Sequence, residues 1–123
     1  MRYLFIAAMG WALVLAGSAP ARADAAAGKA AFAAKDCTGC HYTDGPAKEK
    51  TIDDQLAKKG PELWYAGSKF QKKWLGAWLK DPKPIRPLKY GTLKEKNPGD
   101  HPKMAGAEAA SITDFLMSLT SDA

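Results

Sequence analysis

Residues 37–41 read Cys37-Thr38-Gly39-Cys40-His41, and the rest of the chain can be interpreted around them. Two cysteines separated by two residues and followed at once by histidine are the attachment signature of c-type haem. Each thiol can add across one vinyl group of the porphyrin, and the next side chain then lies beneath the iron as an axial ligand. Because the chain has only 2 cysteines, the signature uses both. The sequence therefore predicts one covalently bound haem c per chain, with His41 as the proximal iron ligand.

Two other kinds of site also use a Cys-X-X-Cys pair. One is a thioredoxin-like redox pair or a small structural disulfide. A thioredoxin-like site needs a strand–helix setting, and no alternating apolar run precedes Cys37. The other is a zinc site, which needs four ligands and usually a second cysteine pair, and the chain has no such pair. Haem attachment is therefore favoured.

Residues 1–23 have the pattern of a secretory signal peptide. Arg2 gives the positive end, an apolar run follows over about residues 3–16, and Ala21-Arg22-Ala23 forms a cleavage site with small residues at both ends. The apolar run is shorter than the roughly 18–20 residues that span a bilayer. We expect cleavage before Asp24, export to the periplasm, and a mature domain of residues 24–123 without stable membrane insertion.

The charge pattern does not favour a nucleic-acid partner. The chain carries 18 Lys and Arg residues against 13 Asp and Glu residues, but the lysines are spread along it without a basic block or interleaved aromatic residues. Most of them, Lys58 included, are expected on a solvated face. A ring of lysines near a haem edge that steers docking onto an acidic redox partner is a weaker hypothesis.

Three stretches have helical character. The first, about residues 25–36, is alanine-rich and runs directly into the haem motif. The second, about residues 68–80, begins at Ser68 as its N-cap and ends at Asp81-Pro82, because proline disfavours helical geometry in the residue before it. The third covers about residues 105–120. The apolar residues of these stretches are Phe32 in the first, Phe70, Trp74, Leu75, Trp78 and Leu79 in the second, and Ala109, Ile112, Phe115, Leu116 and Leu119 in the third.

The second and third stretches are separated by a long segment that is rich in proline. So long an irregular segment is uncommon in a small domain, but a chain that encloses a cofactor needs one. We therefore expect a small all-α fold, with three or more helices and long loops wrapped around one covalently bound haem.

The mature chain resembles the class I monohaem cytochromes c over nearly its whole length. Gly28 and Phe32 resemble the family's glycine and aromatic pair on the first helix, and Phe115 its partner on the last helix. Gly60-Pro61-Glu62-Leu63 is similar to the family's Gly-Pro-X-Leu element. The resemblance implies that the Pro61 carbonyl accepts a hydrogen bond from His41, and that Pro61 and Leu63 lie in the haem pocket. Softer candidates, for hydrogen bonds to the haem propionates, are Trp64, Tyr65, Arg86 and Tyr90.

The distal iron ligand has two candidates. The family default is methionine, and Met104 is the only methionine in the long loop. Met104, however, directly precedes the third helical stretch, where an apolar residue usually packs at the helix entry. His101-Pro102 occupies the place where the family has methionine followed by proline, and an imidazole also binds haem iron well. His101 is preferred, Met104 is the alternative, and an open sixth position is the third option.

The resemblance implies an electron carrier and not an enzyme. Such a carrier exchanges one electron with periplasmic donor and acceptor proteins. The alternative is a haem subunit of a larger periplasmic oxidoreductase, for example a sulfur-oxidising or dehydrogenase complex. An open sixth position would instead indicate a ligand-binding cytochrome.

Overall fold

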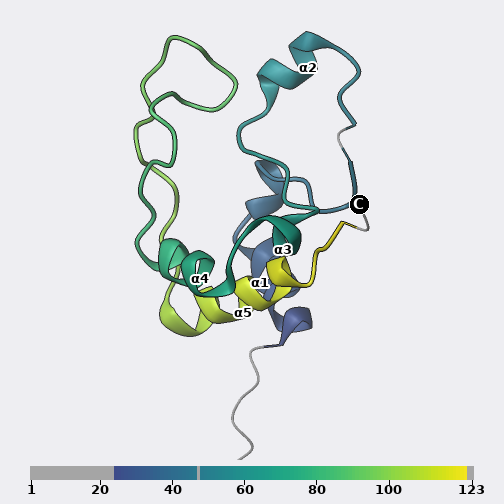
Figure 1. The fold of residues 1–123 in the computed structure, drawn as a ribbon, viewed down its shortest axis with the longest axis vertical. Coiled ribbons are helices and arrows are strands. Elements are labelled where there is room, and N and C mark those ends of the chain that lie inside the picture. The colour runs from purple at the N-terminus through teal and green to yellow at the C-terminus, as the bar shows by residue number, and fades with distance from the viewer. Residues whose placement is uncertain (1–23, 47, 122–123) are drawn as a thin grey trace, which may run out of the picture.

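The computed structural model describes residues 24–46 and 48–121, so the expected signal peptide lies outside the described residues. The helices are α1 (Ala25–Ala34), α2 (Ile52–Ala57), α3 (Ala66–Lys69), α4 (Lys72–Lys80) and α5 (Gly106–Met117), with a short 3₁₀ turn at Cys37–Gly39 (Figure 1). The described part contains no strand, only a single antiparallel bridge between Leu88 and Lys96. The all-α fold is confirmed. No helix in the described ranges is long and apolar enough to cross a membrane.

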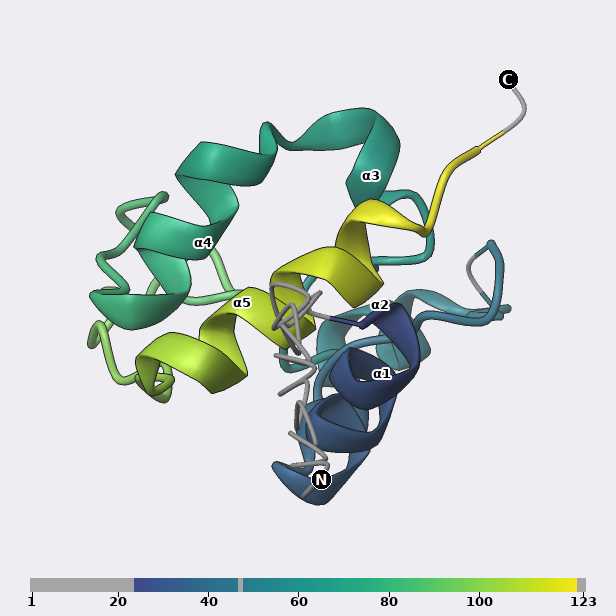
Figure 2. The same cartoon turned by 90° about the horizontal axis from the view of Figure 1, so that it is seen from below.

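The first and last helices cross in close contact, as Figure 2 shows. Asp24 caps α1 by accepting a hydrogen bond from the backbone N–H of Ala26 at 2.9 Å. Gly28 is buried against α5, where a Cβ atom on it would lie 2.8 Å from Cβ of Phe115. The Phe32 and Phe115 rings meet edge to face with their centroids 5.5 Å apart. The glycine and aromatic pattern read from the sequence therefore marks the main helix–helix contact.

The second helical stretch is divided in two, so the prediction of one helix over residues 68–80 was wrong at its start. Ser68 lies inside α3 and caps nothing, and Gln71 is the residue that precedes α4. Phe70 between them is extended, with φ −109° and ψ 151°. The backbone N–H of Gly67 donates to Leu119 O at 2.7 Å. This bond fixes α3 at the end of α5, so the chain bends at Phe70 before α4 packs along the same helix.

The core is formed by the helices together with Leu63 and Met104. In α4, Leu75 and Leu79 are buried, and the helix ends at Asp81 before Pro82, as expected. Met104 is 6% exposed, and its backbone N–H donates to Leu79 O at 2.9 Å. The buried hydrophobic residues are Phe32, Leu63, Ala66, Leu75, Leu79, Met104, Ala109, Ile112, Phe115 and Leu116.

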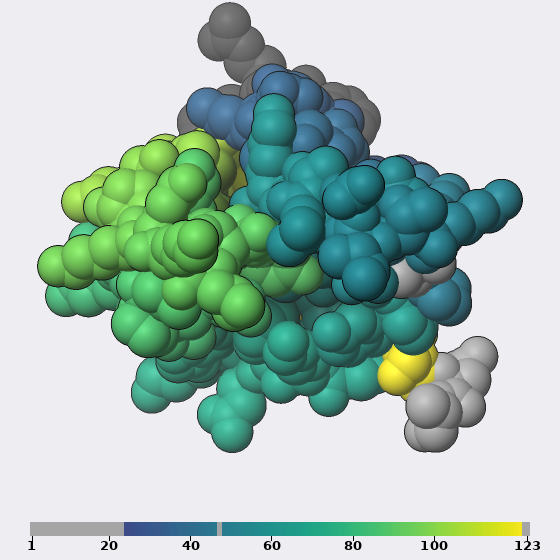
Figure 3. Space-filling view, turned by 90° about the horizontal axis from the view of Figure 1, so that it is seen from above, coloured from purple at the N-terminus to yellow at the C-terminus, as the bar shows by residue number. Residues whose placement is uncertain are grey.

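Two long segments rise from the same side of these helices. One, residues 42–60, carries α2, and the other, residues 81–105, links α4 to α5 (Figure 1). The space-filling view shows the two segments next to each other above the helices (Figure 3). The 81–105 segment is shaped by backbone hydrogen bonds from Lys89 N–H to Glu95 O and from Asn97 N–H to Pro87 O, both 2.9 Å. These segments are the irregular parts that the sequence predicted around a cofactor.

Candidate functional site

The Cys37–His41 turn follows directly from the end of α1. Asp36 adopts a left-handed conformation with φ 55°, which turns the chain sharply after the helix. The backbone N–H groups of Cys40 and His41 then donate to Cys37 O at 3.2 and 3.0 Å. Since one carbonyl holds both residues, the turn keeps the two thiols and the imidazole on one short arc.

Both cysteines are free thiols. Cys37 is partly buried and Cys40 is exposed. Burial, with the nearby Asp36 carboxylate adding to it, raises the pKa of the Cys37 thiol. The reactive cysteine of a thioredoxin-like site has a lowered pKa, because its thiolate is the nucleophile. The shift at Cys37 is therefore opposite in direction to the lowered pKa of a reactive thioredoxin-like cysteine.

His41 is oriented by the segment that contains Pro61. Its Nδ1 lies 2.7 Å from Pro61 O, and because a carbonyl only accepts, Nδ1 is the donor. Burial lowers the pKa of His41, which favours the neutral ring. Gly60 allows this close approach, since a Cβ atom there would lie 2.6 Å from Cε1 of His41. With Nδ1 protonated, the lone pair of Nε2 is available to a metal ion.

His101 lies opposite His41. Their ring centroids are 6.2 Å apart, with an angle of 48° between the ring planes. Two imidazoles bound to one metal ion from opposite sides, at nitrogen–metal distances of about 2.0–2.1 Å, have ring centroids roughly 6 Å apart. His101 Nδ1 contacts Pro102 O at 3.0 Å, and the Trp78 ring lies 4.6 Å from the imidazole. The separation of the two ring centroids is therefore close to that of two imidazoles bound to one metal ion.

Met104 is placed differently. Its side chain is part of the hydrophobic core, next to the start of α5. The position of Met104 is the one that the sequence suggested for an apolar residue at the helix entry.

The donor set fits a haem c. Two free thiols stand on the same turn as His41, and the second imidazole stands across from it. Leu63 is buried, and its backbone N–H donates to Tyr42 O at 2.8 Å, which ties the Pro61 segment to the residue after His41. The roles of these residues in holding haem remain predictions.

The softer candidates for propionate contacts have other partners. Trp64 Nε1 donates to Glu62 Oε2 at 3.0 Å, and Tyr65 packs edge to face on Trp64 with their centroids 4.8 Å apart. The Arg86 guanidinium stacks on the Tyr90 ring at 4.9 Å, within the 81–105 segment. Their role at the haem propionates stays a prediction.

Sequence reasoning missed a cluster of charged residues beside the Pro61 segment. Lys58 was expected on a solvated face, but its side chain is only 9% exposed, and its Nζ forms ion pairs with Glu49 and Glu62. The only signal in the sequence was the spacing of Lys58 and Glu62, four residues apart. That spacing is common on solvated helices, so it did not distinguish a buried pair from an exposed one.

Residues 25–120 match the family model described as Cytochrome c. No curated protein and no solved structure matches the chain. The matched range contains the Cys37–His41 turn, the Pro61 segment, His101 and the contact between α1 and α5.

Proposed function

The chain belongs to the cytochrome c family, and on that basis we propose that it is a periplasmic electron-transfer protein that carries one electron on a single haem c. Cys37 and Cys40 would form the two thioether bonds, and His41 would be the proximal ligand. The haem supplies the Fe(III)/Fe(II) couple, and the protein supplies ligands, orientation and burial. The partners are a periplasmic donor protein and a periplasmic acceptor protein.

The distal ligand in this proposal is His101. The observation that carries it is the 6.2 Å separation of the His41 and His101 ring centroids, while Met104 is buried in the core. With both His41 and His101 bound to the iron, no position would be left for an external ligand, which favours electron transfer over ligand binding. Because a thioether ligand raises the reduction potential, the bis-histidine centre would have a lower potential than a His/Met centre.

The remaining residues orient these groups. The Pro61 carbonyl fixes the proton of His41 on Nδ1, which directs Nε2 toward the metal. The Trp78 indole lies against His101, and its Nε1 donates to Lys83 O at 2.9 Å, which anchors the start of the 81–105 segment to α4. The core formed by α1, α4 and α5 carries both segments and so fixes the distance between the two imidazoles.

Absorption spectra of the oxidised protein test this proposal. The protein is produced with its signal peptide and a haem-attachment system, and purified from the periplasm, where we expect its N-terminus to be Asp24. We expect no red charge-transfer band of methionine ligation in the wild type. His101→Ala should change the spectrum to that of a centre with a weak or absent sixth ligand, and should let the reduced protein bind carbon monoxide. Met104→Leu, which conserves core volume, should leave the spectrum unchanged.

Two results would contradict the proposal. A methionine band that disappears in Met104→Leu would show that Met104 and not His101 is the distal ligand. A colourless mature product would refute haem attachment itself.

A further inference from the structure

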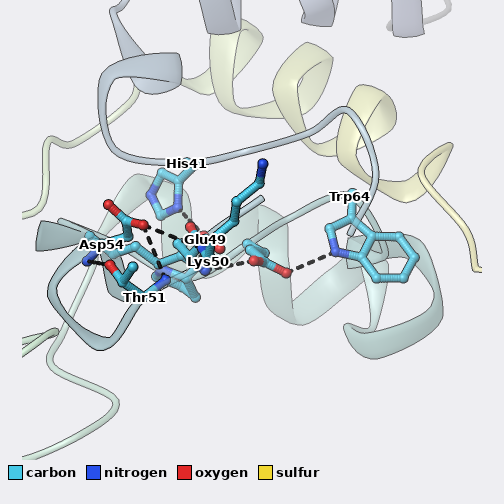
Figure 4. A network of polar contacts seen from close by, with 9 residues as sticks. His41, Glu49, Lys50, Thr51, Asp54 and Trp64 are labelled. Atoms are coloured by element: carbon cyan, nitrogen blue, oxygen red, sulfur yellow. Dashed lines mark hydrogen bonds and ion pairs between the residues drawn. The ribbon is translucent and has the colours of Figure 1, made fainter. Parts of the chain in front are cut away.

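Three charged side chains with little exposed surface form a cluster beside the carbonyl that holds His41. Lys58 Nζ is 2.6 Å from Glu62 Oε1 and 2.9 Å from Glu49 Oε1. The side chains of Lys58, Glu49 and Glu62 are 9%, 5% and 14% exposed, whereas the Lys83–Asp81 pair is 79% and 60% exposed. Figure 4 shows Glu49 in this network, between His41 and Trp64.

An ion cluster withdrawn from water contributes little net stability to a fold. Taking charges out of water costs free energy, and apolar residues of similar volume often stabilise a protein as well or better. Neither oxygen of Glu49 makes a well-aligned hydrogen bond to a described residue, so its contact with Lys58 is an ion pair alone. The carboxylates, Glu62 foremost, raise the pKa of Lys58 above its usual range and keep it charged. A cluster of this kind is better explained by the geometry it imposes than by stability.

The geometry concerns one peptide group. The carbonyl of Pro61 and the backbone nitrogen of Glu62 belong to the same peptide plane, so contacts that hold the Glu62 side chain restrict the backbone next to that carbonyl. The Glu62 side chain is held from one side by Lys58 and from the other by Trp64 Nε1 at 3.0 Å. Lys58 in turn is held by Glu49, which belongs to the segment that follows His41. The cluster therefore joins the two segments whose separation sets the hydrogen bond between His41 and Pro61.

We propose that Lys58, with Glu49 and Glu62, is a positioning residue for the proximal histidine: the ion cluster holds the Pro61 carbonyl on Nδ1 of His41 and thereby lowers the reduction potential of the centre. The inference rests on the proposed haem attachment at His41. It does not depend on which residue is the distal ligand, because the cluster lies on the His41 side.

Two possible effects of removing Lys58 have opposite signs. A hydrogen bond from Nδ1–H to a carbonyl makes the imidazole a more basic ligand, which favours Fe(III). If the cluster positions Pro61, its loss weakens this bond and raises the potential. If Lys58 acted only through its charge, its removal would leave more negative charge near the iron, stabilise Fe(III) and lower the potential.

The test measures the reduction potential and the solvent exchange of the His41 Nδ1 proton in the haem-loaded protein. In Lys58→Met we expect a higher potential and an exchange rate roughly fivefold to tenfold faster, as a weakened hydrogen bond predicts. Lys58→Arg keeps the charge and both contacts, and should return both quantities close to the wild-type values. Lys59→Met removes the same charge from the exposed neighbouring side chain, and should leave the exchange rate unchanged.

Lys58→Met removes the cation from beside two carboxylates. A second variant keeps the inference testable if Lys58→Met does not fold. Glu49→Gln/Lys58→Met removes one charge of each sign, and Glu62 keeps its bond to Trp64. We expect the same faster exchange and higher potential in this double variant. Unchanged exchange in the haem-loaded variants, or a lowered potential in both Lys58→Met and Lys59→Met, would overturn the inference. Absence of haem from the wild-type protein would instead refute the proposed function.

Discussion

Gly28 is the residue at which the first and last helices approach most closely. A Cβ atom there would lie 2.6 Å from the backbone carbonyl carbon of Ser111 and 2.8 Å from Cβ of Phe115. Backbone atoms cannot move aside as the end of a flexible side chain can. Any larger residue at position 28 must therefore push α1 away from α5.

Replacement of Gly28 by alanine should lower the free energy of unfolding by about 1–3 kcal/mol, the usual cost of overpacking a core. The matched control is Gly106→Ala at the start of α5, where a Cβ atom would meet nothing within 4 Å. This control should unfold with an unchanged or slightly higher free energy, since alanine favours helix. Urea titration of the haem-loaded proteins measures both. Equal stabilities for the two variants would show that the helices tolerate separation.

Which single residues could be predicted follows from how local their interactions are. The haem motif and the Gly-Pro element are short, so the sequence predicted the His41–Pro61 hydrogen bond before any fold was known. The burial of Lys58 depends on Glu49 and Glu62 meeting in space, which no spacing rule specifies. The hydrogen bond of Trp64 to Glu62 was also missed, although the two residues are only two positions apart.

At the scale of elements, the helix boundaries that depend on local sequence signals were predicted, and those that depend on contacts between distant residues were not. The apolar stripes of α4 and α5 were predicted because helical spacing is a strong signal. The break at Phe70 was not, since it results from the hydrogen bond between Gly67 and Leu119, which are far apart in the sequence. Asp53 and Asp54 both lie in the first turn of α2.

Helix α2 depends on a capping box, because few of its side chains reach the core. Asp54 N–H donates to Thr51 Oγ1 at 3.1 Å, and Asp54 Oδ2 accepts from Thr51 N–H at 3.2 Å. A further backbone N–H, that of Lys50, lies 3.3 Å from the same oxygen. The Thr51 side chain first, and then these backbone donors, lower the pKa of Asp54 in the folded protein.

The lowered pKa of Asp54 predicts that α2 loses stability in acid. Since the folded pKa lies below the unfolded value of 3.8, the contribution is fully present above that value and is lost as the pH falls through the folded pKa. NMR titration of the Asp54 carboxyl and of the α2 backbone shifts should show both events together. In Thr51→Ala the pKa of Asp54 should move back toward its ordinary value. A titration of Asp54 without any change in α2 would exclude the capping box as the support of this helix.

At the scale of the whole molecule, the two long segments touch at Gly91. Its φ is +79°, and a Cβ atom on it would lie 2.6 Å from Leu56 O and 3.0 Å from Lys58 O. The 81–105 segment, which carries His101, therefore rests on the end of α2 in the segment that follows His41. This contact fixes the distance between the two segments at a point remote from the core helices α1, α4 and α5.

Gly91→Ala should destabilise the protein more than its backbone conformation alone explains. A left-handed conformation costs an alanine about 1–2 kcal/mol, and the clash with Leu56 O should add about 1–3 kcal/mol. Gly45→Ala is the matched control, because Gly45 has φ +101° and its Cβ atom would meet nothing within 4 Å. Unfolding free energies of both variants separate the two costs. If Gly91→Ala lowers the free energy of unfolding no more than Gly45→Ala does, the two segments do not pack against each other at Gly91.

The contact at Gly91 has a consequence for the order of assembly. The two long segments are in contact at Gly91, and α1 and α5 are in contact where they cross, so the chain closes on itself at two separate places. A rigid disc as wide as a porphyrin cannot pass between segments that are already in contact. If haem is attached as proposed, we therefore expect both thioether bonds to form before the two segments close on each other.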